Sequence, residues 1–141
     1  MPYCTQDDLL GLISEAELAQ LTAEAGDVPD SAVVDAVIAK ADAEIDGYLA
    51  QRYVLPIAAV PALVKSLSED MAVYHLYSRR GIMAEARRQK YRDAVTFLKD
   101  VAAGRAQITD LTGAELPSEQ GTVTEISSAD RVFSRETMGD W

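Results

Sequence analysis

Apolar residues recur at helical spacing over residues 31–52, which predicts an amphipathic helix. At about 100° per residue, seven apolar side chains fall within one arc of about 120°. They are Val34, Val37, Ile38, Ala41, Ile45, Tyr48 and Leu49. Asp30 is a favourable N-cap residue, and Pro56 ends the segment because the residue before a proline favours extended geometry. One flank of the arc is acidic and carries Asp35, Asp42 and Asp46.

Two further segments, residues 61–79 and 83–103, repeat this spacing. Pro61 suits the first turn of a helix, Gly81 ends the first segment, and Gly104 fits the position just past a helix end. The shared face of the first segment contains Leu63, Leu67, Met71, Tyr74, Tyr77 and Ser78. One side of the second segment contains Ala84, Arg88, Tyr91, Ala94, Val95, Leu98 and Ala102.

Two short helices are predicted before these long ones. Thr5 followed by Asp8 resembles a capping box, and Ser14 followed by Glu17 repeats the signal. Gly26 then breaks the chain. The sequence therefore predicts an all-α fold, a compact bundle of four to five helices in which the long helices run antiparallel. The predicted core contains Ile45, Tyr48, Leu49, Tyr53, Leu67, Met71, Tyr74, Tyr91 and Leu98.

The chain changes character at about residue 112, where it becomes polar and rich in turn residues. We expect a helical domain over residues 1–111 and a polar arm over residues 112–141, flexible or with a short strand at "TVTEI". Phe133 and Trp141 are unusual in a solvated tail. They are candidate anchors of a docking arm, and a frayed terminus is the alternative.

Arg52 lies at the centre of the apolar arc, and Asp70 lies on the apolar face of the next helix. An unpaired charge there would cost several kcal/mol, whereas a hydrogen-bonded pair is roughly neutral. We therefore expect a partly buried Arg52–Asp70 ion pair that fixes how the two helices cross. In the alternative interpretation Arg52 extends from the helix end and caps its carbonyl groups.

Charge is distributed unevenly along the 141 residues, whose net charge is −10. Residues 1–50 hold 11 acids and 1 base, whereas residues 51–104 hold 5 acids and 9 bases. An acidic protein is a poor non-specific binder of nucleic acid. The partition suggests that acidic and basic segments face each other, within one molecule or between copies. Candidate inter-subunit residues are Asp35, Asp42, Asp46, Arg87, Arg88 and Arg92.

The residues of common catalytic and metal sites are scarce. The chain has one His and one Cys, no glycine-rich phosphate loop and no apolar run long enough for a bilayer. A single Cys4 and no secretion signal are typical of a cytoplasmic protein. His75 is interpreted as a helix-surface or core-edge residue, and zinc would need more ligands. The residues therefore indicate no common catalytic, cofactor or metal site.

Four blocks, read in order, resemble the small virion protein of Mu-like phages and prophages. They are "DDLLGLISEAELAQLT", "AEIDGYLAQRYVLPI", "VPALVKSLSEDMAVYHLY" and "RRQKYRDAVTFLKDVAAG". The resemblance covers about residues 3–111, and "IDGYLAQRYVLP" followed by "VPALV" and "DMAVYHLY" is its most specific part. It does not extend with certainty to residues 112–141.

The resemblance implies an all-helical head-completion or head–tail connector protein without enzymatic activity or cofactor. It implies a ring of copies, commonly twelve, docked beneath the phage portal and contacting tail-completion proteins. Such a protein would occupy the host cytoplasm during assembly and the virion neck afterwards, without contact to membrane or to specific nucleic-acid sequences. The alternatives are a cytoplasmic helical adaptor that binds another protein, and a helical enzyme in which Asp35 or Asp42 lines a pocket.

Overall fold

The computed structural model describes residues 2–82, 84–109 and 117. These residues form five α-helices and no strand longer than an isolated bridge. The helices are α1 (Gln6–Leu10), α2 (Glu15–Thr22), α3 (Ser31–Leu49), α4 (Ala62–Arg79) and α5 (Glu85–Ala102). The predicted all-α class is confirmed. Apart from Pro117, the predicted arm over residues 112–141, with Phe133 and Trp141, lies outside the described residues.

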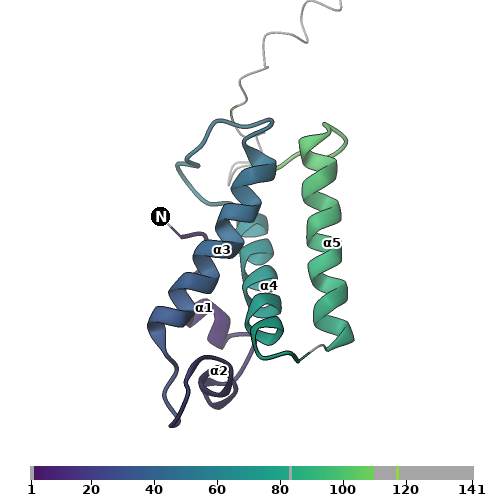
Figure 1. Cartoon of the computed structure of the whole chain (residues 1–141). Helices are drawn as coiled ribbons and strands as arrows, with labels where there is room; N and C mark the ends of the chain where they lie inside the picture. Colours follow the sequence, from purple (N-terminus) through teal and green to yellow (C-terminus); the bar gives the residue numbers. More distant parts are fainter. Residues whose placement is uncertain (1, 83, 110–116, 118–141) are drawn as a thin grey trace, which may run out of the picture.

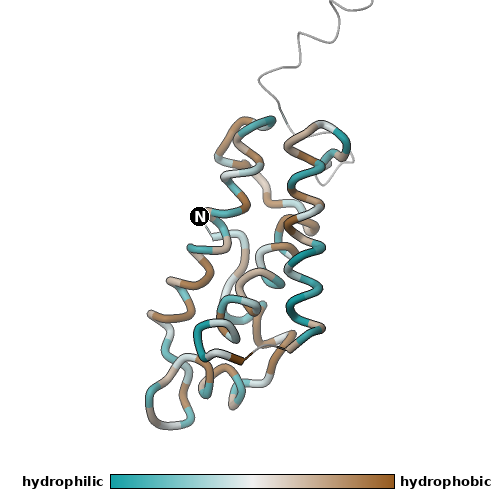
Figure 2. The backbone as a smooth tube through the Cα atoms, turned by 45° about the vertical axis from the view of Figure 1, so that its right-hand side comes forward, coloured by the Kyte–Doolittle hydropathy of each residue, from teal (hydrophilic) through white to brown (hydrophobic). Residues whose placement is uncertain are grey.

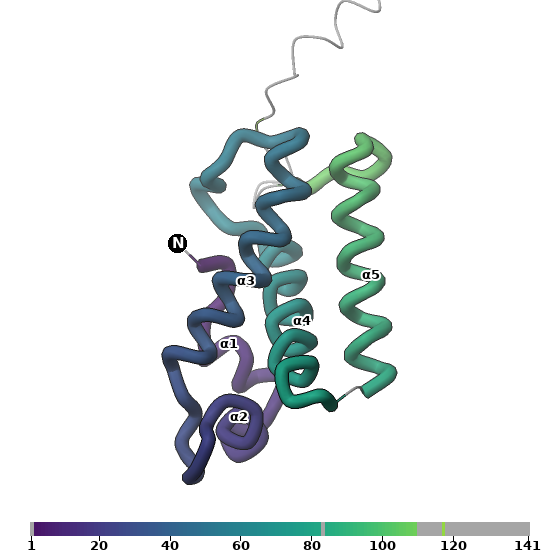
Figure 3. The backbone as a smooth tube through the Cα atoms, in the orientation of Figure 1, coloured from purple at the N-terminus to yellow at the C-terminus, as the bar shows by residue number. Residues whose placement is uncertain are grey.

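The three long helices alternate in direction. In Figure 1, α3 runs upward, α4 returns downward and α5 runs upward again. α4 contacts every other helix, whereas α1 and α2 pack on the α3–α4 pair from the side opposite α5. The backbone trace in Figure 3 shows the same layout, with α4 between the N-terminal helices and α5.

Local sequence signals explain where the helices start. The Thr5 side chain accepts from the amide of Asp8, and the Asp8 carboxylate accepts from the amide of Thr5, which completes the predicted capping box of α1. Ser14 accepts from the Glu17 amide at α2, and Asp30 accepts from the first amides of α3. Each cap satisfies amides that have no partner inside the helix.

Glycines follow the two last helices at the positions that the sequence predicts. Gly81 has φ of +73° and Gly104 has φ of +82°. This left-handed geometry costs other residues about 1 kcal/mol or more, which explains why glycine stands just past each helix end. The loop between α3 and α4 contains a cis Leu55–Pro56 peptide bond.

The core lies around α4. Six of the predicted core residues are buried, namely Ile45, Leu49, Tyr53, Leu67, Met71 and Leu98. Tyr48, Tyr74 and Tyr91 are half-buried; Tyr48 and Tyr91 pack against this core, and Tyr74 stacks on Tyr91. The buried surface of α4 is wider than the periodicity indicates, because it also includes Val64, Val73 and Leu76, while Leu63 is 45% exposed. A helix with neighbours on several sides buries more than one stripe.

Figure 2 shows how hydropathy follows this arrangement, with long hydrophilic stretches along α5 at the edge of the molecule. Within the described residues, no helix combines the length and apolar character that crossing a bilayer requires.

Candidate interaction surfaces

The structure does not contain the predicted Arg52–Asp70 ion pair. Nη1 of Arg52 instead donates to the carbonyl oxygens of Ala106, at 2.6 Å, and Val101, at 3.5 Å. These carbonyls lie at and beyond the C-terminal end of α5, where the helix dipole favours a cation. Arg52 thus caps carbonyl groups, as the alternative proposed, but those of a different helix. The prediction failed because the chain after α5 folds back over the end of α3.

Tyr53 strengthens the same junction. Its hydroxyl accepts a hydrogen bond from the Ile108 amide at 2.9 Å, and the Arg52 guanidinium lies 5.4 Å from the centre of its ring. The Val54 amide donates to the Pro117 carbonyl at 2.9 Å. Consecutive residues after α3 therefore fix the chain that follows α5.

Two of the three aspartates on α3 hold the N-terminal segment. The Asp42 carboxylate accepts hydrogen bonds from the Tyr3 amide, at 2.9 Å, and from the Ser68 hydroxyl, at 2.6 Å. The Tyr3 hydroxyl donates to Asp46. Burial raises the pKa of Tyr3, and the neighbouring Asp46 carboxylate raises it further. Asp42 and Asp46 thus have structural roles inside one chain, whereas Asp35 is exposed and accepts no hydrogen bond from another described residue.

A groove of about 520 Å³ lies along the junction of the N-terminal segment with α3. Its lining combines acidic groups with small apolar ones. The residues are Pro2, Cys4, Thr5, Gln6, Asp35, Ile38, Ala39, Asp42, Ala43 and Asp46. We call this feature the N-terminal groove. Its carboxylates come from the α3 stripe that the sequence singled out, but its second wall, residues 2–6, was not predicted.

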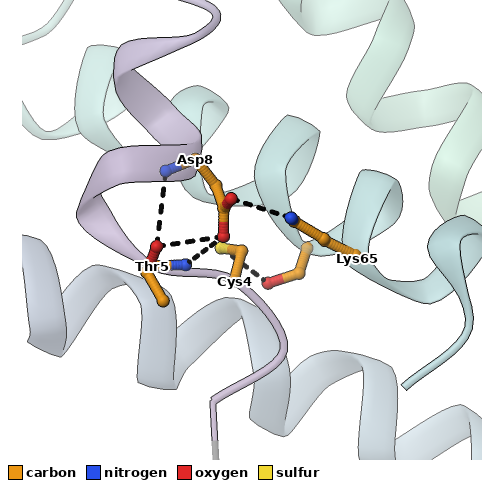
Figure 4. A network of polar contacts seen from close by, with 5 residues as sticks. Cys4, Thr5, Asp8 and Lys65 are labelled. Atoms are coloured by element: carbon orange, nitrogen blue, oxygen red, sulfur yellow. Dashed lines mark hydrogen bonds and ion pairs between the residues drawn. The ribbon is translucent and has the colours of Figure 1, made fainter. Parts of the chain in front are cut away.

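A second polar network attaches α1 to α4 (Figure 4). Lys65 lies 2.8 Å from the Asp8 carboxylate, which also accepts from Thr5. The hydrogen bond from Lys65 lowers the pKa of Asp8. Nearby, the Ser68 hydroxyl contacts the buried Cys4 sulfur at 3.2 Å. Burial raises the pKa of the Cys4 thiol to about 11, which makes it a poor nucleophile at neutral pH.

The basic side chains of α5 lie largely in solvent. Arg88, Arg92 and Lys99 are exposed, whereas Arg87 is half-buried with its guanidinium 5.7 Å from the centre of the Tyr77 ring. The ion pairs among the described residues are Lys65–Asp8, His75–Glu44 and Arg105–Asp100. None of them joins an acid of α3 to a base of α5. Within the described residues, the α3 carboxylates and the α5 bases therefore do not neutralise each other, although the Lys65–Asp8 pair joins a base of residues 51–104 to an acid of residues 1–50.

One charged junction connects the three long helices. Nε2 of His75 on α4 lies 2.6 Å from one oxygen of Glu44 on α3, although the contact lacks hydrogen-bond alignment. The Tyr91 hydroxyl on α5 donates to the other oxygen at 2.9 Å, and the Tyr91 ring stacks on Tyr74 at 4.0 Å. Burial lowers the pKa of His75 against the opposing effect of Glu44. Sequence reasoning missed this junction, because Glu44 stands outside the apolar arc of α3.

The arrangement offers little to catalysis. Among the described residues, no group of three or more His, Cys, Asp or Glu side chains is placed to hold a metal ion. The enzyme interpretation required Asp35 or Asp42 to line a pocket, and both line the N-terminal groove. Asp42, however, is engaged by Tyr3 and Ser68, and Asp35 is exposed. The groove lining contains no histidine, and its one thiol, Cys4, stays protonated at neutral pH because burial raises its pKa to about 11.

Fold and surfaces define a small all-α protein that presents an acidic groove and a basic helix to other molecules. The chain belongs to the family described as "Bacteriophage Mu, Gp36", whose profile matches residues 3–126. It is 34% identical over 143 residues to "Gene product J" of Escherichia phage Mu, and the alignment covers 99% of each chain. It is 36% identical over 109 residues to "Mu-like prophage FluMu protein gp36" of Haemophilus influenzae, covering 77% of this chain and 74% of the relative.

Family membership confirms the predicted relation to Mu-like phage proteins. It supports a structural or morphogenetic role in such a phage or prophage, and it favours a protein without enzymatic activity.

Proposed function

We propose that this protein acts in head completion and head–tail joining, by forming or contacting a ring below the portal. Family membership supports a phage role. The observation that supports a ring is the placement of two charged surfaces, the N-terminal groove and the basic residues of α5. The N-terminal groove lies between residues 2–6 and α3. α5, whose exposed side chains include Arg88, Arg92 and Lys99, lies across the bundle from the N-terminal segment (Figure 1).

Surfaces on opposite sides of a subunit suit a head-to-tail interface. Such heterologous contacts generate a closed ring when the rotation per subunit is right, whereas a two-fold dimer uses one surface twice. Opposite charges on the two surfaces would steer neighbouring copies into contact and select the correct orientation. The same surfaces leave the ends of the bundle available to portal and tail components.

Electron microscopy of lysates from an induced prophage that lacks this gene tests the proposal. We expect complete heads and complete tails that are not joined, and we expect wild-type protein supplied in trans to restore joined particles. Normal joined particles in the deletion strain would refute the connector role and favour the adaptor, a helical module that binds a soluble partner protein.

The polar arm gives a second test, although it lies outside the described residues. Deletion of residues 123–141 should leave a folded domain that cannot support joining, because Phe133 and Trp141 would act as anchors on assembly. Circular dichroism measures folding and the complementation assay measures joining. Normal joining after this truncation would contradict a role of the arm.

A further inference from the structure

We propose that the N-terminal groove receives α5 of a neighbouring copy, so that Asp35 contacts Arg88 and Asp46 contacts Lys99. This inference rests on the proposed function and specifies its subunit interface. It commits the groove to one occupant, a second copy of this chain, on the basis of charge and spacing.

The two surfaces match in spacing along their helices. Asp35 and Asp46 are separated by 11 residues on α3, and Arg88 and Lys99 by 11 residues on α5. Eleven residues make about three turns, so each pair lies on one side of its helix, about 16 Å apart. Arg92 shares the stripe of Arg88 and Lys99 to within about 40°. In the same register Arg92 faces Ala39, between the carboxylates of Asp35 and Asp42.

The match holds for helices that run in the same direction. α3 and α5 are parallel within one copy (Figure 1), and in a closed ring of many copies each neighbour is rotated by only a small angle. The α5 of one copy therefore runs roughly parallel to the α3 of the next. A two-fold dimer, by contrast, could not place both surfaces at one contact.

The groove has the chemistry to accept long basic side chains. Ala39 and Ala43 are exposed and small, so the backbone of α3 can be approached closely, and Ile38 supplies apolar surface. The aliphatic parts of Arg and Lys can cover this surface while their charged ends reach the carboxylates. Asp35 is fully available, whereas Asp46 keeps one carboxylate oxygen beyond the one that Tyr3 contacts. On the opposite surface Arg88, Arg92 and Lys99 make no ion pair with the described residues.

Site-directed crosslinking in purified particles tests the contact directly. The variant Asp35→Cys/Arg88→Cys, supplied in trans to the deletion prophage, is treated with a short bismaleimide. We expect a ladder of covalent oligomers on denaturing gels. The matched control is Asp35→Cys/Asp93→Cys, because Asp93 is exposed on α5 but lies about 140° from Arg88 around the helix. The control should remain monomeric, as should each single variant, and Cys4 is buried.

Charge reversal supplies an independent readout. Asp35→Arg and Arg88→Asp should each lower the yield of joined particles by about tenfold or more, because they place like charges in contact. The double variant Asp35→Arg/Arg88→Asp should recover most of the yield. Both positions are exposed, so thermal unfolding of the free protein should change little.

Three outcomes separate the two levels of the proposal. Joined particles without the gene would refute the proposed function itself. A gene required for joining, with no ladder from the Asp35→Cys/Arg88→Cys variant, would overturn only the groove contact. Reversals that abolish joining without recovery in the double variant would also overturn it, and would assign the groove to a different protein.

Discussion

Both sides of the α3–α4 pair bury apolar residues against it, and they differ in the polar contacts that accompany this burial. On the N-terminal side, polar bonds connect each element to the pair, through Asp42, Asp46 and the Asp8–Lys65 ion pair. Arg79 and Arg80 of α4 also donate to the carbonyl oxygens of Leu21 and Ala23. On the other side, α5 is attached by buried apolar residues and by polar contacts at its two connections, the Glu44 junction and the Arg52 cap.

This difference explains the charge partition that the sequence shows. Asp42 and Asp46 of α3 bind the N-terminal segment of the same chain, whereas Arg88, Arg92 and Lys99 of α5 make no ion pair with the described residues. The acidic stripe of α3 and the basic stripe of α5 look equivalent in the sequence, but they differ in how many contacts they make within the chain. Among the carboxylates of α3, Asp35 is the one that is exposed as the bases of α5 are, and it is therefore one of the two acids in the proposed contact.

The apolar attachment of α5 should give the largest loss of stability. Leu98 is completely buried between α5 and the core, so Leu98→Ala should lower the free energy of unfolding by about 2–5 kcal/mol. Chemical denaturation followed by circular dichroism measures it. Thr96→Ala, at an exposed position of the same helix, should change the value by less than about 0.5 kcal/mol. Equal effects at both positions would contradict an apolar attachment.

Loss of the Arg52 cap should give the second-largest decrease in the free energy of unfolding. Arg52→Ala removes charged hydrogen bonds to carbonyl groups at the end of α5, which are worth about 1.5–3 kcal/mol. Amide hydrogen exchange should rise in residues 101–108 more than elsewhere. Arg88→Ala, which removes an exposed arginine from α5, serves as the control. Faster exchange spread evenly over the molecule would argue against a local cap.

Substitution of a carboxylate that holds the N-terminal segment should lower the free energy of unfolding by less. Asp42→Asn should cost about 1–2 kcal/mol, because the amide cannot replace both charged hydrogen bonds of the carboxylate. The Tyr3 amide should exchange faster with solvent. Asp35→Asn should leave both the stability and this amide unchanged, since Asp35 holds no part of the N-terminal segment. A matching effect of Asp35→Asn would remove the distinction between the two carboxylates.

The Glu44 junction predicts a modest pH dependence. Burial lowers the folded-state pKa of His75, so the unfolded chain binds the proton more readily. The corresponding stability is present at pH values above the unfolded pKa of about 6.5 and is lost as the pH falls through it. The free energy of unfolding should therefore decrease between pH 7.5 and pH 6, and His75→Gln should flatten this slope. An unchanged slope in the variant would assign the dependence to other groups.

The sequence by itself determined the elements that depend on near neighbours. The caps at Thr5, Ser14 and Asp30 and the glycines after α4 and α5 act within a few residues of the helix ends that they set. Periodicity likewise placed most of the core, because one buried face of a helix repeats every three to four residues. The scarcity of His and Cys in the composition was enough to argue against common catalytic and metal sites.

Tertiary structure alone decided which polar groups meet. Arg52 binds carbonyl groups about 50 residues away in the chain, Asp42 binds Tyr3 and Ser68, and His75 is buried against Glu44. Helical periodicity places a side chain on a face but does not say which other element covers that face. Partners of buried polar groups depend on how the helices cross and on where the connecting segments return, and these are properties of the packed molecule.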